Sequence, residues 1–429
     1  MSDIYFPRVI DDVLKKRLSM IGAILIVGPK WCGKTTTAMQ YSNSVLQLQD
    51  PDNRQSYLEL AQIKPSKLLE GEKPRLIDEW QMAPVLWDAV RTSVDNLSGE
   101  GLYILTGSTV VDESKIMHSG TGRINRLTML PMSLYESKES NGKISIMELF
   151  NNPNMDIDGI ESDLSIEGLI FAACRGGWPE SINKNDKEAQ LFVAKNYVEN
   201  ICNSDMSNID GFKRDPKKVK AILKAYARNI STIASNETII KDIRGTFPEM
   251  ASSTFYDYVN ALSKLFVIDN VPGWSPNIRS AKSMRATPKK EFIDPSISVA
   301  SLELNPESLI FDLNTFGFIF ETLCIRDLKV YASNANGHVS YYRDKYGLES
   351  DCVLHLGNGD YALIEFKLGG DNIDEGSKHL IKLNNLIEEK IFENNLKIKK
   401  PKFLAVITGG KFAYTRKDGV KVIPIGCLR

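Results

Sequence analysis

The stretch Gly28-Pro-Lys-Trp-Cys-Gly33-Lys34-Thr35 follows the apolar residues 21–27 (IGAILIV) and precedes the helix-compatible residues 36–41. This is the order strand, G-x-x-x-x-G-K-T, helix that a phosphate-binding loop requires. The two glycines let the backbone curl around an anion, and the N–H groups of the loop and of the first helical turn point inward. The stretch therefore predicts a P-loop at the start of an α/β domain, against the alternative of a glycine-rich turn that binds nothing.

Each residue type in this loop has a predicted role. The Lys34 ammonium group is expected to reach the β- and γ-phosphates of ATP, and the Thr35 hydroxyl to coordinate Mg²⁺. The bulky pair at positions 31 and 32 stands where smaller or polar residues are usual, but both side chains can point away from the phosphates. The predicted nucleotide-binding residues are Gly28, Pro29, Lys30, Trp31, Cys32, Gly33, Lys34, Thr35 and Thr36, joined by Asp78 and Ser108.

The composition fits two or three globular domains. The chain has 429 residues, of which 42% are hydrophobic and 25% charged, and its formal net charge is −1. Such a charge gives no global attraction to nucleic acid, so any DNA-binding surface must be local. The N-terminus lacks a signal core and no apolar run approaches the span of a bilayer, which predicts a soluble, cytoplasmic protein without membrane contact. The six cysteines contain no C-x-x-C pair and predict neither a zinc site nor a disulfide framework.

A second motif of the nucleotide domain is the acidic strand end at residues 76–79 (LIDE). A strand that ends in Asp-Glu places one carboxylate where it can hold a metal ion and the next where it can polarise an attacking water. We assign Asp78 to the metal and Glu79 to the water. A solvated turn is the alternative, which the preceding P-loop disfavours.

Two further features follow along the chain. Residues 101–108 (GLYILTGS) read as a buried strand whose polar end, Thr106 or Ser108, is a candidate γ-phosphate sensor, with ordinary turn chemistry as the alternative. Arg123 follows Gly122 on a predicted surface turn. Such an arginine can be presented to the nucleotide of a neighbouring subunit, which would require a homo-oligomer, or it can make a local salt bridge.

These motifs carry a resemblance that covers most of the chain. The loop at 28–35, the strands at 76–79 and 105–108, the Gly-Arg pair at 122–123 and the sequence GGWPE at 176–180 resemble prokaryotic AAA-superfamily ATPases with an uncharacterised C-terminal domain. The resemblance implies ATP binding and hydrolysis. It leaves the physiological role undefined.

The middle of the chain predicts helices and a winged helix-turn-helix. Helical stretches at 166–174, 189–202, 218–233, 238–243 and 252–262 precede a predicted strand at 265–269. A group of basic residues nearby could bind DNA phosphates: Lys264, Arg279, Lys282, Arg285, Lys289 and Lys290. Winged helices also mediate protein contacts or serve as lids, so that DNA contact is one of several alternatives here.

The last third of the chain contains a nuclease-like set of residues. Residues 339–344, 349–355 and 361–367 read as successive strands, preceded by an amphipathic helix at 316–328 that carries Glu321. Asp351 precedes Glu365-x-Lys367 on the next strand, where the period of two puts Glu365 and Lys367 on one face. Asp351 and Glu365, completed by Glu321, could bind Mg²⁺, and Lys367 could orient a water that attacks a phosphodiester.

This order of elements, with a helix at 376–393 and a closing strand at 402–408, resembles the restriction-endonuclease-like PD-(D/E)xK fold. We therefore predict an α/β chain with an AAA-type P-loop ATPase domain (1–155), a helical lid and winged-helix domain (156–285) and a PD-(D/E)xK nuclease-like domain (286–429). The predicted function is an ATPase coupled to a nuclease-like domain that acts on DNA. The alternative is an ATP-dependent switch whose other domains only bind DNA or protein. A small-molecule kinase fits poorly, because it leaves the paired acids and the two further domains without a task.

Overall fold

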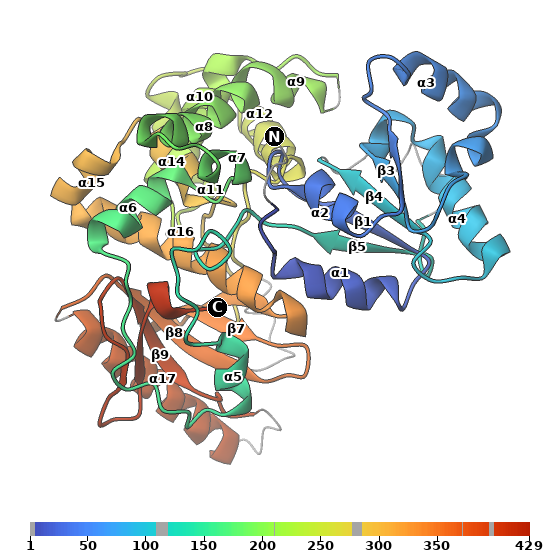
Figure 1. Cartoon of the computed structure of the whole chain (residues 1–429). Coiled ribbons are helices and arrows are strands. Elements are labelled where there is room, and N and C mark those ends of the chain that lie inside the picture. Colours follow the sequence, from blue (N-terminus) through green and yellow to red (C-terminus); the bar gives the residue numbers. More distant parts are fainter. Residues whose placement is uncertain (1–4, 109–118, 210, 277–284, 371, 394–398) are drawn as a thin grey trace. The chain divides into compact units, whose positions relative to one another are not determined.

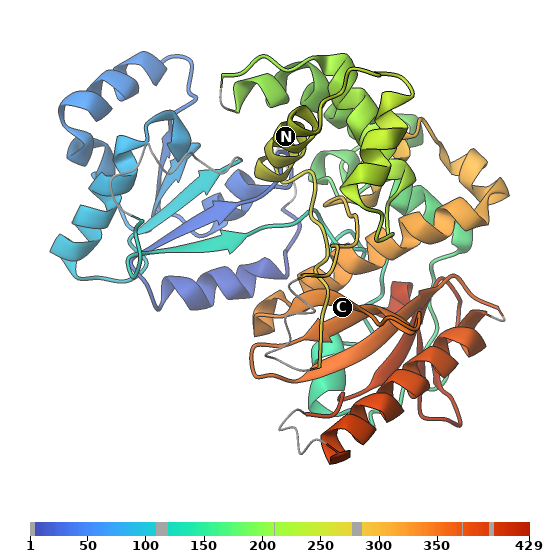
Figure 2. The same cartoon turned by 180° about the vertical axis from the view of Figure 1, so that it is seen from behind.

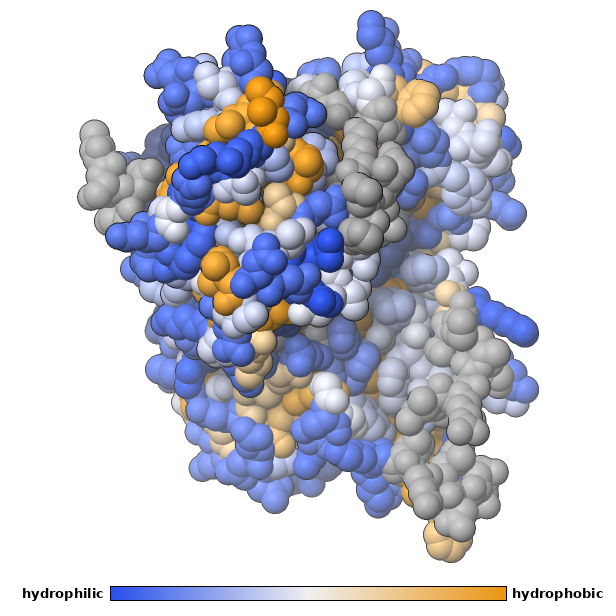
Figure 3. All heavy atoms as spheres, turned by 90° about the vertical axis from the view of Figure 1, so that its right-hand side faces the viewer, coloured by the Kyte–Doolittle hydropathy of each residue, from blue (hydrophilic) through white to orange (hydrophobic). Residues whose placement is uncertain are grey.

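A computed structural model describes residues 5–108, 119–209, 211–276, 285–370, 372–393 and 399–429. Its contacts divide the chain into two compact units (Figure 1). The first unit comprises Met1–Pro131 with Lys264–Phe266, and the second comprises Met132–Ser263 with Val267–Arg429. On the face drawn in Figure 3, hydrophilic residues are mixed with smaller hydrophobic areas.

This division differs from the predicted boundaries at residues 155 and 285. Residues 132–163 belong to the second unit because their backbone pairs with the end of the chain. Ile144 bridges Leu428 and Glu161 bridges Phe412. The predicted middle and C-terminal domains thus share one compact unit.

The first unit is built on a five-stranded parallel sheet of order β2-β3-β4-β1-β5. The strands are β1 (Ala23–Val27), β2 (Ser44–Gln47), β3 (Arg75–Asp78), β4 (Tyr103–Gly107) and β5 (Ile124–Thr128). Strand β4 lies between β1, which leads into the P-loop, and β3, which carries the acids. Because all strands run the same way, the ends of these three strands meet at one edge of the sheet.

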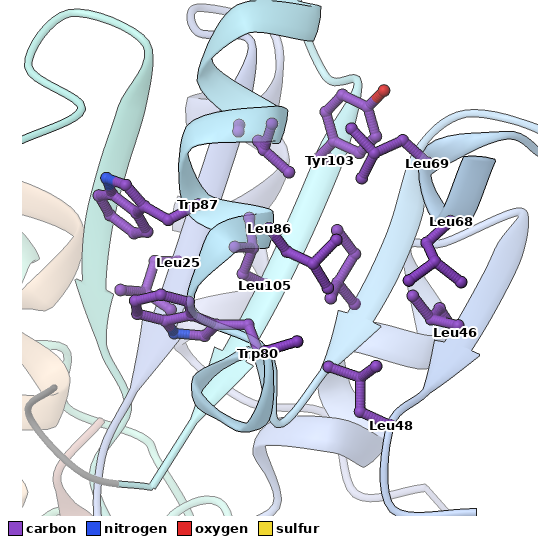
Figure 4. Packing of buried hydrophobic residues seen from close by; sticks show 14 of the residues in the cluster. Leu25, Leu46, Leu48, Leu68, Leu69, Trp80, Leu86, Trp87, Tyr103 and Leu105 are labelled. Carbon is purple, nitrogen blue, oxygen red and sulfur yellow. The ribbon is translucent and has the colours of Figure 1, made fainter. Parts of the chain in front are cut away.

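Helices cover both faces of this sheet. The helices are α1 (Ile10–Leu18), α2 (Lys34–Gln40), α3 (Arg54–Ile63) and α4 (Val85–Leu97), with short 3₁₀ segments at Pro65–Leu69 and Trp80–Met82. Alternate residues of β1 enter different cores: Ile24 and Ile26 pack with α1 and α2, whereas Leu25 packs with α4. Figure 4 shows the second of these cores, in which Leu86 and Trp80 pack with strand residues.

The second unit begins with a group of helices. They are α5 (Ile146–Asn151), α6 (Ile166–Arg175), α7 (Pro179–Ile182), α8 (Lys187–Asn200), α9 (Met206–Asn208), α10 (Pro216–Arg228), α11 (Asn236–Arg244), α12 (Ser252–Lys264), α14 (Pro295–Ser301) and α15 (Pro306–Phe311). A π-helical turn at Ile201–Asp205 joins α8 to α9. Each predicted helix of the middle region is present, although the one predicted for 218–233 ends at Arg228.

The predicted strand at 265–269 is wrong. The chain turns after α12, because Phe266 adopts a positive φ of 58°. Isolated bridges follow: antiparallel ones from Ile268 to Phe292 and from Val271 to Lys289, and a parallel one from Gly273 to Tyr341. We call residues 267–273 and 286–293 the extended pair. Three helices followed by an extended pair match the order predicted for a winged helix, and the winged helix itself stays a prediction.

Two of the basic residues predicted to bind DNA phosphates are buried. Lys289 and Lys290 are only 7% and 2% exposed, and their ammonium groups bind Glu321 and Asn236. Their prediction as phosphate-binding residues is wrong for this conformation, since neither reaches the surface. Lys264 and Arg285 are exposed. Arg279 and Lys282 lie outside the described residues.

The C-terminal part of the second unit is a six-stranded mixed sheet of order β10-β11-β9-β8-β7-β6. The strands are β6 (His338–Arg343), β7 (Glu349–His355), β8 (Tyr361–Lys367), β9 (Leu404–Thr408), β10 (Tyr414–Thr415) and β11 (Lys421–Pro424). Strands β6, β7 and β8 are antiparallel neighbours, and β8, β9 and β11 are parallel. Helices α16 (Leu313–Tyr331) and α17 (Asn372–Glu393) cover the two faces (Figures 1 and 2).

Candidate functional site

The P-loop joins β1 to α2 in the predicted way. Gly28 has a φ of 152°, and a Cβ added there would lie 2.1 Å from the Met129 carbonyl oxygen. No side chain fits at this position. Gly33 is left-handed, with a φ of 98°, and α2 begins at the next residue. The first turn of α2 thus directs its backbone N–H groups toward the loop, as an anion site requires.

The side chains of the loop lie on two sides. Cys32 is buried and its thiol donates to the Met129 carbonyl at 3.6 Å, whereas Trp31 is 43% exposed. Both bulky side chains therefore leave the centre of the loop open. The Lys34 ammonium donates to the carbonyl oxygens of Gly28 and Pro29 at 3.1 and 2.7 Å. The Lys34 side chain thus extends back across the loop to its first two residues.

Arg8 supports the loop from behind and was missed by the sequence reasoning. Its guanidinium is buried and donates to the carbonyl oxygens of Cys32 and Leu130, both at 2.8 Å. These bonds tie the loop to the segment that follows β5. No motif marks Arg8, because an isolated arginine near a chain start has no pattern of its own.

The sheet edge brings the predicted metal ligands together. The hydroxyls of Thr35 and Thr106 both donate to Asp78 Oδ1, each at 2.6 Å. Thr35 comes from α2, Asp78 from the end of β3 and Thr106 from β4. A hydroxyl and a carboxylate oxygen at this separation are hard oxygen ligands of the kind that Mg²⁺ prefers. The fit to Mg²⁺ rests on this pair.

Glu79 lies beside this pair in an unusual backbone conformation. Its φ of 56° turns the chain out of β3, and its N–H donates to the Thr106 hydroxyl at 3.2 Å. The Ser108 hydroxyl donates to Glu79 Oε2 at 3.3 Å, and the Gln81 amide donates to the same oxygen. Glu79 is thus held by the two candidate sensors, Thr106 and Ser108, and by Gln81. The sequence reasoning missed Gln81, because glutamines are common in turns.

Arg123 does not join this group. It lies just before β5, and its carbonyl accepts from the N–H of Ala23, which is the first residue of β1. The P-loop follows the last residue of β1, about 13 Å along the strand. The Arg123 guanidinium instead bonds to Asp95 Oδ1 at 2.7 Å. Arg123 therefore cannot serve the nucleotide of its own chain.

A second group of charged side chains lies in the second unit. Because Cys352 pairs with Ile364, the neighbouring Asp351 and Glu365 lie opposite each other on β7 and β8. Lys367 Nζ is 2.8 Å from Glu365 Oε2 and 3.5 Å from Asp351 Oδ2. The Lys289 ammonium bonds to Glu321 and lies 3.8 Å from Asp351 Oδ1. We call Lys289, Glu321, Asp351, Glu365 and Lys367 the acid–lysine cluster.

Burial dominates the electrostatics of this cluster. It raises the pKa of Glu321 to about 8, and with the repulsion from Asp351 it also raises the pKa of Glu365 well above its usual range. Against the effect of burial, the ammonium groups of Lys289 and Lys367 lower the pKa of Asp351. The cluster thus holds one carboxylate that is strongly charged and two that readily bind protons.

The fit of the cluster to a metal ion is partial. Glu365 is 1% exposed, and its Oε1 lacks a hydrogen-bond partner. This orphaned oxygen beside Asp351 could bind a cation. Across the described ranges, however, no three His, Cys, Asp or Glu side chains are arranged to hold a metal. The sequence predicts Lys289 only as a phosphate-binding residue, so its place in the cluster was missed.

Within the described part of the chain, no helix is long and apolar enough to cross a bilayer. Residues 21–138 match the family model of an AAA domain. Two models of domains of unknown function match later parts of the chain: DUF8612 at residues 166–308 and DUF4143 at residues 316–428. No curated protein sequence matches the chain significantly.

Solved structures are similar to this chain at low identity. A Walker-type ATPase of Pyrococcus abyssi is 15% identical with a TM-score of 0.41, over 69% of this chain and 96% of that one. Drosophila ORC bound to DNA is 12% identical with a TM-score of 0.21, over 65% and 89%. A Pyrococcus horikoshii STAND protein with a tetratricopeptide repeat sensor is 14% identical with a TM-score of 0.23, over 74% and 47%.

The family match covers the P-loop, the acidic strand end and the polar end of β4. The parallel sheet and the loop geometry agree with it. Residues 21–138 therefore form an AAA-type P-loop ATPase domain.

Proposed function

We propose that the first unit hydrolyses ATP with Mg²⁺. The observation that carries this proposal is the set of bonds at the sheet edge. Asp78 Oδ1 accepts from Thr35 at the start of α2, and Glu79 lies next to it on the chain. These contacts support a metal-binding pair, Thr35 and Asp78, beside the Glu79 carboxylate and near the P-loop. An ATP hydrolase needs these three parts at one edge of its sheet.

Each residue has a role in this reaction. The loop N–H groups and Lys34 bind the phosphates. To do so, the Lys34 ammonium exchanges the carbonyl oxygens of Gly28 and Pro29 for phosphate oxygens. Thr35 and Asp78 hold Mg²⁺, which when bound neutralises phosphate charge. Glu79 orients the attacking water and accepts its proton, while Ser108 and Gln81 fix the position of the Glu79 carboxylate.

Phosphate release from Mg-ATP by the purified full-length protein tests this proposal. We expect turnover by the wild type and its loss in Lys34→Ala, because the phosphates lose their main cationic partner. Lys64→Ala is the matched control, since Lys64 is an exposed lysine of the same unit. Equal rates in the wild type and Lys34→Ala would contradict the proposal.

Arg123 is proposed to act on the nucleotide of a neighbouring subunit. Its place at the opposite end of β1 from the P-loop supports action in trans over action in its own chain. An arginine that acts in trans contributes about 10³–10⁵-fold in kcat where it is used. We expect Arg123→Ala and Lys34→Ala each to be inactive alone. In a mixture, subunits with an intact loop can meet subunits with an intact Arg123, so that activity returns.

The mixture is compared with each variant alone at the same total protein concentration. The activity of wild type should also rise more than linearly with concentration. If Arg123→Ala hydrolyses ATP like the wild type, Arg123 only forms its local ion pair with Asp95.

For the second unit we propose a nuclease-like activity on DNA that is coupled to ATP hydrolysis. What supports this is the pairing of Asp351 opposite Glu365 with Lys367 in contact with both. Asp351 and Glu365 would hold Mg²⁺, which supplies Lewis-acid activation of a phosphodiester when bound. Lys367 would orient the attacking water.

An ATP-dependent switch that only binds DNA or protein is the second candidate. Its support is that the lysines already pair with the carboxylates, so that the cluster could serve as a buried structural network. Cleavage of labelled single- and double-stranded DNA with Mg²⁺ or Mn²⁺ separates the two candidates.

In this assay we expect Lys367→Ala to abolish cleavage while ATP turnover is kept, because the lysine contacts both acids and belongs to the second unit, not to the unit that carries the P-loop. Lys411→Ala is the control, since Lys411 is exposed and its ammonium pairs with Glu161 on the surface. Cleavage that persists in Lys367→Ala, or that is absent from the wild type while ATP turnover is intact, would favour the switch.

A further inference from the structure

We propose that Lys289 is a built-in cation that occupies the metal position of the acid–lysine cluster, so that a divalent ion binds only when Lys289 withdraws. This inference rests on the nuclease-like function proposed above. It concerns the control of the cluster, and the experiment below distinguishes its failure from that of the proposed function.

The contacts of the Lys289 ammonium are those of a bound cation. It bonds to the Glu321 carboxylate and lies 3.8 Å from Asp351 Oδ1 and 3.5 Å from the Asp351 carbonyl oxygen. Two carboxylates and a carbonyl are the hard oxygen ligands that Mg²⁺ and Mn²⁺ take. The Lys289 side chain is 8% exposed, so water supplies little of its solvation.

Lys289 also explains why the acids do not form a metal-binding group. The Glu321 carboxyl group bonds to Lys289, and Asp351 lies between Lys289 and Lys367. A divalent ion that entered beside both ammonium groups would be repelled at close range in a medium of low dielectric constant. The unpartnered Glu365 Oε1 is the oxygen left over by this arrangement.

Lys289 reaches the cluster from outside the sheet that carries the acids. Its backbone exchanges two hydrogen bonds with Val271, at 2.9 and 3.0 Å, within the extended pair. Asp351 and Glu365 are fixed separately by the ladder between β7 and β8. The extended pair is bridged to β6 between Gly273 and Tyr341, so Lys289 withdraws by moving its side chain away from Glu321 while the two acids keep their places.

Mn²⁺ binding to the full-length protein, measured by electron paramagnetic resonance without nucleotide, tests this inference. Every protein carries Asp78→Asn, which removes the predicted metal ligand of the P-loop. We expect Lys289→Met to bind Mn²⁺ at least about tenfold more tightly than the parent, because a competing charge is gone. Adding Asp351→Asn should abolish the gain.

Lys290→Met is the matched control. Lys290 is a buried lysine of the same segment, but its ammonium bonds to Asn236 and lies outside the cluster. We expect its Mn²⁺ affinity to equal that of the parent. If Lys289→Met binds Mn²⁺ no more tightly than the parent does, the proposed role of Lys289 is wrong, while the proposed nuclease activity is not affected. If neither protein binds Mn²⁺, the metal-dependent nuclease is overturned with it.

A second measurement covers the case in which Lys289→Met does not fold. In the parent protein, an amine-reactive reagent should leave Lys289 unmodified without metal and modify it at saturating Mn²⁺, as read by peptide mass spectrometry. Lys290 serves as the internal reference. Unchanged modification of Lys289 at saturating Mn²⁺ would overturn the inference.

Discussion

Glu79→Gln is expected to lower kcat for ATP hydrolysis by about 10²–10⁴-fold, the range usual for loss of a general base. Glutamine keeps the size of the side chain and can still meet the Ser108 hydroxyl, but it cannot accept a proton from the attacking water. ATP affinity should stay close to that of the wild type, since Lys34, Thr35 and Asp78 are untouched. Phosphate release gives kcat, and equilibrium titration with a fluorescent ATP analogue gives the affinity.

Glu72→Gln is the control for this change. Glu72 is exposed and lies shortly before β3, outside the group of residues at the sheet edge. It should leave both kcat and affinity unchanged. A Glu79→Gln protein with wild-type kcat would show that another group receives the proton.

Arg326→Met is expected to lower the free energy of unfolding of the second unit by about 3–5 kcal/mol, as is usual when one member of a buried ion pair is removed. The Arg326 guanidinium is buried on α16 and bonds to Asp294 at 2.9 Å and to Asp327 at 2.7 Å. Methionine fills similar space but leaves two buried carboxylates without their cation. Urea unfolding followed by circular dichroism measures the loss.

The contacts of these two carboxylates explain why the loss of stability should extend beyond α16. Asp294 accepts from the N–H of Gly177 and caps α14, while Asp327 accepts from the N–H of Leu134. Arg326 thus stabilises the junction of three segments distant in sequence. Arg343→Met is the control, because Arg343 is half exposed and pairs with Glu349 at 3.7 Å. Similar losses in both variants would contradict this account.

Much of the first unit could be predicted from the sequence because its signals are local. The loop at 28–35, the acids at 78 and 79 and the polar end of β4 each lie within a short motif. Parallel strands then bring these ends to one edge. The backbone turn at Glu79 and its bond with Gln81 depend on tertiary packing, and no local pattern indicates them.

The second unit shows where sequence reasoning fails. A lysine is usually exposed, so the sequence predicts that Lys289 and Lys290 can bind phosphates at the surface. Their burial depends on partners at positions 321 and 236, which are distant in sequence. The alternation that placed Glu365 beside Lys367 is a local property of one strand, and these two side chains do lie in contact.

DNA cleavage by the full-length protein with Mg²⁺, with and without ATP, tests the proposed coupling when wild type and Lys34→Ala are compared. We expect ATP to change the cleavage rate of the wild type and to have no effect on Lys34→Ala, whose loop cannot use the nucleotide. Cleavage by the wild type at the same rate with and without ATP would contradict the proposed coupling between the two units.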